Sequence, residues 1–165
     1  MRKASCSGPN TYSWPWPSGI APAGPSSVPG DRPVTAPVTP GDPTVWRRHP
    51  HAPAPGTELG PAGAIPDGQG REFAFGPESD AFRMFVVRRG SEVFGYLNVC
   101  PHFSLRLNYR PDQFTTRDGE ILCSMHFALF RASDGVCIDG ACPGRALDPV
   151  PVEVTSDGTL RIATG

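Results

Sequence analysis

Two short motifs, Cys100-Pro101-His102 and Cys123-Ser124-Met125-His126, carry the strongest signal in this 165-residue sequence. Each motif places a thiol and an imidazole two or three residues apart at the end of an apolar run. If the motifs fold together, they present two Cys and two His side chains to one site, a donor set that suits a metal. The 20 residues between them are a tolerable spacer, since closure entropy grows only logarithmically with length, and residues 108–119 are expected to form a surface excursion.

Two metal centres suit these four side chains. Zinc accepts two Cys and two His ligands (Cys2His2) in a tetrahedron. A [2Fe–2S] cluster accepts two thiolates on one iron and two imidazoles on the other. The number of ligands does not distinguish the two centres, and two unrelated Cys/His pairs are a third interpretation.

The sequence around the motifs predicts strands rather than helices. Residues 82–87 form an apolar run typical of a strand, and Arg89-Gly90-Ser91 predicts a turn after it. Residues 130–138 predict a hairpin around Asp134-Gly135. No window predicts a helix of ten or more residues, so we expect an all-β domain of packed antiparallel sheets. Other apolar residues that predict strands are Val93, Leu97, Val99, Ile121, Leu122, Val150, Val152, Val154, Leu160 and Ile162.

Proline and glycine divide the chain into two parts. Residues 1–70 contain 15 of the 21 Pro, 10 of the 19 Gly and none of the nine Phe. A segment so poor in apolar surface does not offset its ordering entropy, and Pro interrupts regular hydrogen bonding. We therefore expect residues 1–70 to be a disordered tail, or to lie partly upstream of the true start codon. Residues 71–165 are expected to form one small domain.

The charge balance indicates no nucleic-acid or membrane partner. Fifteen basic and 16 acidic residues give a net charge of −1, so the chain lacks the positive excess that binds nucleic acids or anionic membranes. No apolar stretch approaches the roughly 20 residues that cross a bilayer. Pro and Gly follow Met1-Arg2-Lys3, where a signal peptide would continue with apolar residues. We expect a cytoplasmic protein.

The residues around the motifs resemble the Rieske iron–sulfur family, whose pattern is Cys-x-His, a spacer and Cys-x-x-His. The likeness extends to Leu97-Asn98-Val99 before the first motif and to Ala128-Leu129-Phe130 after the second. In residues 134–147 and the following Pro149-Val150-Pro151-Val152, the chain is similar to small stand-alone bacterial Rieske ferredoxins. The resemblance covers residues 71–163. It implies Rieske-like antiparallel sheets with a small cluster-binding subdomain, and one [2Fe–2S] cluster per chain.

The resemblance also implies a role for each motif residue. Cys100 and Cys123 would bind the inner iron, and His102 and His126 the outer iron near the tip of the protein. The implied function is electron transfer between a flavin-dependent reductase and an oxygenase or nitrite-reductase-like acceptor, without catalysis by this chain. The chain offers no glycine-rich nucleotide motif, and no His follows His126 to help hold a catalytic mononuclear iron. A zinc-binding structural module and a cluster-based redox sensor are the alternatives.

The sequence departs from the family pattern beside both histidines. The glycine that commonly follows each His is replaced, by Phe103 and Ser104 in the first motif and by Phe127 in the second. Together with Leu105 and Met125, the two Phe side chains are expected either to form an apolar docking rim or simply to pack around the cluster.

Two further cysteines, Cys137 and Cys142, lie five residues apart after the second motif. This spacing permits a disulfide or a second metal pair. No His lies nearby, however, and a cytoplasmic protein keeps its thiols reduced. We expect two small, buried, reduced residues in a turn.

The midpoint potential of the cluster is expected to lie below about +200 mV, short of the upper end of the Rieske range. In respiratory-chain Rieske proteins, hydroxyl donors to the cluster occupy the positions of Ala128 and Phe130, and a disulfide joins those of Leu105 and Met125. Without such donors the more negative reduced cluster is less stable, which lowers the potential. A redox titration followed by EPR measures the midpoint, and a value well above about +200 mV would contradict this expectation.

Overall fold

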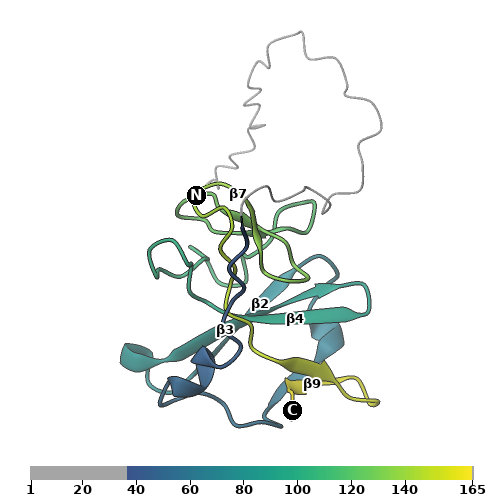
Figure 1. Cartoon of the computed structure of the whole chain (residues 1–165). Coiled ribbons are helices and arrows are strands. Elements are labelled where there is room, and N and C mark those ends of the chain that lie inside the picture. The colour runs from purple at the N-terminus through teal and green to yellow at the C-terminus, as the bar shows by residue number, and fades with distance from the viewer. Residues whose placement is uncertain (1–36, 165) are drawn as a thin grey trace, which may run out of the picture.

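The computed structural model describes residues 37–164, which fold into three antiparallel sheets of three strands each (Figure 1). The strand orders are β1-β9-β8, β2-β3-β4 and β5-β6-β7. The elements are η1 (Val45–Arg48), β1 (Glu58–Pro61), η2 (Ala62–Ala64), β2 (Gly70–Phe75), η3 (Glu78–Asp80), β3 (Phe82–Arg89), β4 (Glu92–Leu97), β5 (Ile121–Leu122), β6 (Leu129–Phe130), β7 (Cys137–Asp139), β8 (Val152–Val154) and β9 (Thr159–Ile162), where η marks a 3-10 helix.

Strand β3 lies at the centre of the fold because both of its faces are buried. Phe82, Met84 and Val86 join one core, and Phe85 and Val87 join the other, as the two-residue period of a strand requires. This explains why the sequence shows a continuous apolar run here instead of alternation. Strands β2 and β4 pair with β3 on either side and extend it into a layer between the two cores.

The first core lies between the central sheet and the sheet β1-β9-β8. Trp46 and Ile65 pack there with Leu160 and Ile162 of β9. Trp46 keeps only 2% of its surface exposed, and its indole N–H donates to the carbonyl of Pro43 at 2.9 Å. Figure 1 shows β9 at the opposite end of the molecule from β7.

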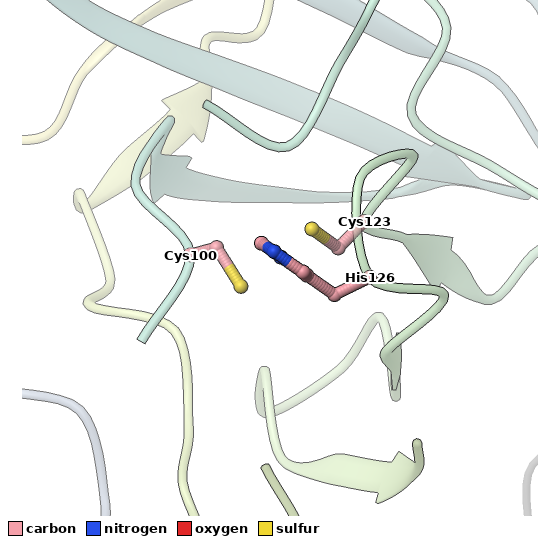
Figure 2. Close-up of side chains that lie close together, drawn as sticks. All are labelled: Cys100, Cys123 and His126. Atoms are coloured by element: carbon pink, nitrogen blue, oxygen red, sulfur yellow. The ribbon is translucent and has the colours of Figure 1, made fainter. Parts of the chain in front are cut away.

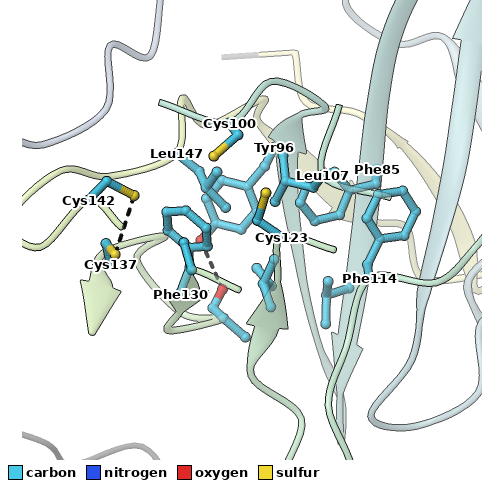
Figure 3. Packing of buried hydrophobic residues seen from close by; sticks show 14 residues of the cluster. Phe85, Tyr96, Cys100, Leu107, Phe114, Cys123, Phe130, Cys137, Cys142 and Leu147 are labelled. Carbon is cyan, nitrogen blue, oxygen red and sulfur yellow. Dashed lines mark hydrogen bonds between the residues drawn. The ribbon is translucent and has the colours of Figure 1, made fainter. Parts of the chain in front are cut away.

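The second core lies on the other face of the central sheet and includes the small sheet β5-β6-β7. Phe85 and Tyr96 reach it from the central sheet, and Phe114 stacks on Phe85 with ring centroids 4.2 Å apart. Cys100 and Cys123 belong to the same core, which Figure 3 shows from close by. The two Cys/His motifs therefore lie where the central sheet meets the small one.

The prediction of an all-β fold with antiparallel sheets is confirmed for the described residues, whose longest helix is the four-residue η1. The strand predicted at residues 82–87 is β3, and the hairpin predicted at residues 130–138 is the pair β6-β7. The excursion expected at residues 108–119 is anchored in the core, because Phe114 within it is fully buried. Within residues 37–164, no helix has the length and apolar character that crossing a membrane requires.

The expectation that residues 1–70 form a tail is wrong for the part that the structure describes. Residues 58–61 form β1, which pairs with β9, and both Trp46 and Ile65 lie in a core. The Pro-rich composition gives no signal for this strand. Pro61 is tolerated in β1 because β1 lies at the edge of its sheet and needs hydrogen bonds on one side only. Residues 1–36, on which the rest of that expectation falls, lie outside the described residues.

Candidate metal centre

Each motif cysteine begins a tight loop that two backbone hydrogen bonds close. In the first loop, the N–H of Ser104 donates to the carbonyl of Cys100 at 2.9 Å, and the N–H of Cys100 donates to the carbonyl of Leu105 at 2.7 Å. Because the loop returns on itself, Cys100 lies fully buried at its base while His102 is half-buried within it.

The second loop repeats this pattern. The N–H of Phe127 donates to the carbonyl of Cys123 at 2.9 Å, and the N–H of Cys123 donates to the carbonyl of Ala128 at 2.9 Å. The N–H of Ser124 also donates to the carbonyl of Leu107 at 2.7 Å, which joins the second loop to the chain leaving the first. Two segments far apart in the sequence are thus closed in the same way and held together.

Both loops turn at a residue in the left-handed region of backbone conformation. Ser104 and Phe127, which donate to the two cysteine carbonyls, each have a φ of 55°. A side chain with a Cβ costs roughly 1–2 kcal/mol in this conformation, where glycine fits freely. The glycines missing from the two motifs therefore do not prevent the turns, but each replacement stores strain beside the candidate ligands.

Three candidate donor atoms converge between the loops. The sulfurs of Cys100 and Cys123 and a ring nitrogen of His126 all lie within 4.8 Å of one another (Figure 2). Both thiols are fully buried, and His126 is half-buried. Across residues 37–164, no other group of three or more Cys, His, Asp or Glu side chains converges in this way.

His102, the fourth predicted ligand, is not part of that group of three converging side chains, but it lies beside it. Its ring lies edge-on to that of His126, with centroids 4.7 Å apart and planes at 90°. Of the buried side-chain nitrogen and oxygen atoms in the described part of the chain, only Nδ1 of His102 and Nδ1 of His126 lack a hydrogen-bond partner. A buried polar atom without a partner costs about 1–3 kcal/mol, and a bound metal would remove that cost. The residues present therefore fit a centre with two sulfur and two nitrogen ligands.

The environment of Cys100 favours the protonated thiol when no metal is bound. Burial raises the pKa of the Cys100 thiol to about 11, while the backbone N–H groups of His102 and Phe103 beside the sulfur act in the opposite direction. A metal ligand is a thiolate, so metal binding displaces this proton. The buried site thus disfavours a free thiolate and accommodates one that is neutralised by a cation.

A buried polar network fixes the base of the first loop. Asn98, which is 1% exposed, accepts the N–H of Leu107 through its side-chain oxygen at 2.9 Å. Its amide nitrogen donates to Glu72 at 2.9 Å and to Asn108 at 2.8 Å. Because Asn98 precedes the loop and Leu107 and Asn108 follow it, the network holds the two ends of the loop together and attaches them to β2.

The sequence alone does not single out these supporting residues. Arg145, which donates to the carbonyl of Pro101 at 2.7 Å, gives no local signal of that role. For Asn98 the one signal is a polar side chain between the apolar Leu97 and Val99 at the end of a predicted strand. A buried hydrogen bond between distant segments becomes visible only when the fold brings them together.

The comparison with known families identifies the centre. A profile of the Rieske [2Fe-2S] domain matches residues 57–155, which include both loops. The chain belongs to the Rieske family. The site is therefore that of a [2Fe–2S] cluster, a one-electron carrier, and the zinc alternative is not supported. The matched Rieske domain also begins beside β1, before the boundary expected at residue 71.

Similar proteins include one of Haloferax mediterranei that is named as a candidate Rieske subunit of a respiratory nitrate reductase. It is 37% identical over 70 residues, which are 42% of this chain and only 29% of that relative. The ferredoxin of carbazole 1,9a-dioxygenase from Nocardioides aromaticivorans IC177 has a similar fold, with a TM-score of 0.50, 19% identity and coverage of 68% of this chain and 100% of its own. For the ferredoxin of Sphingomonas yanoikuyae B1, the TM-score is 0.50, the identity 22% and the coverage 67% and 99%.

Replacement of His126 by Ala is expected to abolish the Rieske absorption and EPR spectra, because the outer iron would lose one of two nitrogen ligands. Replacement by Cys is expected to abolish them as well or to shift them toward those of an all-thiolate cluster. The matched control is His51→Ala, since His51 lies outside both loops. Absorption and EPR spectra of the purified variants test the assignment, and a His126→Ala spectrum like that of the unmodified protein would refute it.

Proposed function

We propose that this protein is an electron carrier, not itself an enzyme, that passes single electrons from a flavin-dependent reductase to an oxygenase or a nitrite-reductase-like acceptor. In the proposed site, Cys100 and Cys123 hold one iron, and His102 and His126 hold the other through Nδ1. The observation that carries the proposal is the pair of buried, unpartnered Nδ1 atoms on two adjacent rings, one of which converges with two buried thiols. When bound, the cluster accepts and releases one electron at a time.

The mixed ligand set suits this role through its charge. Two thiolates balance the formal charge of the oxidised cluster core, and two neutral imidazoles add none. Four thiolates would leave the centre negative and make it harder to reduce. The reduction potentials of Rieske centres are therefore higher than those of plant-type ferredoxins. The chain's own contribution is to bury the thiols and to leave the two buried Nδ1 atoms free of other hydrogen-bond partners.

An exposed apolar rim beside the two histidines supports docking of a redox partner. The rim consists of Phe103, Leu105, Met125 and Phe127, which are 65%, 47%, 49% and 74% exposed. Phe103 lies against both imidazole rings, with centroids 4.1 and 5.3 Å away. Side chains this exposed leave apolar surface that a partner could cover, and a small apolar patch suits a transient redox encounter.

The remaining histidines of the described chain lie near one carboxylate. His49 and His51 each place Nε2 3.7 Å from a carboxylate oxygen of Asp80. Two His and one carboxylate are the ligands of catalytic mononuclear iron, but in residues 37–164 only Cys100, Cys123 and His126 converge within 4.8 Å. His49, His51 and Asp80 instead tie the segment around η1 to η3.

The setting that we propose is an oxidoreductase system in the cytoplasm, where nicotinamide nucleotides supply flavin-dependent reductases. The name of the H. mediterranei relative supports a nitrogen-oxide reductase as one kind of acceptor.

A stopped-flow experiment tests the carrier role by mixing the dithionite-reduced full chain with an oxidised Rieske oxygenase or nitrite reductase. We expect the cluster to reoxidise and to survive repeated cycles. A cluster that is reduced but not reoxidised by either acceptor would contradict the carrier role and favour the redox sensor.

Removal of the rim side chains is expected to slow electron transfer without changing the cluster. Truncation of a central apolar contact costs about 1–2 kcal/mol of binding, so Phe103→Ser and Phe127→Ser should each lower the second-order rate constant about tenfold. The matched control is Val154→Ser, an exposed apolar residue on β8 in another sheet. Stopped-flow rate constants of the variants check this prediction, and their midpoint potentials and absorption spectra show whether the cluster itself is unchanged. Unchanged rates in both Phe variants would contradict a docking role for the rim.

A further inference from the structure

Two thiols outside the proposed ligand set lie in contact. The sulfurs of Cys137 and Cys142 are 3.4 Å apart, and the side chains are 0% and 5% exposed (Figure 3). Cys137 begins β7, and Cys142 follows in the loop after that strand. The electron-carrier role uses neither thiol. A turn that needed only small buried residues would not require two sulfurs side by side.

Two hydrogen bonds hold the two thiols next to each other. The thiol of Cys142 donates to the sulfur of Cys137 at 3.4 Å, and the thiol of Cys137 donates to the carbonyl of Asp139 at 3.3 Å. A disulfide bond is about 2 Å long, so closing the pair requires the sulfurs to approach by little more than an ångström. Local adjustment of a short loop is enough for this movement.

The loop between the two thiols packs against the second cluster loop. A Cβ added at Gly140 would lie 2.7 Å from the carbonyl oxygen of Phe127 and 2.8 Å from the Cα of Ala128. The backbone that follows His126 is therefore in direct contact with the chain that Cys137 and Cys142 enclose. A covalent bond between these cysteines would stiffen the segment that supports the second loop.

We propose that Cys137 and Cys142 are a thiol–disulfide site whose oxidation braces the second cluster loop. The oxidant is a small-molecule disulfide such as oxidised glutathione. The sulfur of Cys142 attacks it, forming a mixed disulfide and releasing one glutathione thiol. The sulfur of Cys137 then attacks that of Cys142 and releases the second thiol. Two cysteine thiols are oxidised, one glutathione disulfide is reduced to two thiols, and both cysteine protons leave with them.

The surroundings of Cys142 set the order and the speed of this exchange. Cys142 is the less buried thiol, and its neighbours Ala141 and Pro143 are exposed, so it meets the oxidant first. Burial raises the pKa of the Cys142 thiol well above its ordinary value, and the bond to Cys137 acts in the same direction. Thiolate is the attacking form, so this direction slows the exchange near neutral pH.

The sequence allows a direct test of the pairing. Trypsin cleaves after Arg131 and after Arg145, and the peptide of residues 132–145 contains both Cys137 and Cys142 and no other cysteine. The cluster-loaded full chain is equilibrated in buffers of graded oxidised-to-reduced glutathione ratio, then denatured, alkylated and digested. We expect the peptide to become lighter by two hydrogens and resistant to alkylation in oxidised buffer, and to revert with dithiothreitol. Alkylation of both cysteines at every ratio would overturn the proposal.

Two controls separate the brace from damage to the cluster. Cluster absorbance is recorded through the same series, and closure of the peptide only after that absorbance is lost would contradict a site in the intact protein. The Cys142→Ser variant is expected to keep the Rieske spectrum and to form no internal disulfide. In oxidised buffer the unmodified chain should lose its cluster to a chelator more slowly than this variant, and equal rates would contradict the bracing role.

Discussion

The structure depends on removing two thiol sulfurs and two imidazole nitrogens from water at one place. Neither Cys100 nor Cys123 has any exposed surface, and Nδ1 of His102 and of His126 is buried without a hydrogen-bond partner. Each of these groups is costly to bury alone, since a polar atom loses its water and a thiol resists ionisation. In the proposed site, iron would satisfy all four at once, so the cluster would be both the functional group and part of what stabilises the two loops.

The fold makes this burial possible by presenting the loops as a matched pair. Strand β3 fills two cores with alternate side chains, and the second core continues into the small sheet and the two cysteines. The same two hydrogen bonds close each loop, and each turns at a strained left-handed residue, Ser104 or Phe127. Strain of this kind persists only where surrounding contacts determine the backbone, and the Asn98 network and the contact at Gly140 provide such contacts.

Much of this arrangement could be predicted from the sequence because its signals are local. The two motifs contain their ligand types, β3 is a continuous apolar run typical of a strand buried on both faces, and the apolar residues of β8 and β9 alternate with strand periodicity. The structure of the described part of residues 1–70 could not be predicted, because this Pro-rich segment has no periodicity of its own. A few buried side chains such as Trp46 attach it to the core. The polar partners of Asn98 could not be predicted either, nor could the contact of Cys137 with Cys142, because spacing alone does not distinguish paired thiols from separate ones.

Pulsed EPR of the reduced, full-length protein tests the central claim most directly, with and without nitrogen-15 histidine. The account predicts hyperfine couplings from two distinct histidine nitrogens, both altered by the label, because Nδ1 of His102 and of His126 would bind the same iron in the proposed site. Coupling to a single histidine nitrogen, to none, or the absence of any iron–sulfur signal would contradict the proposed ligand set.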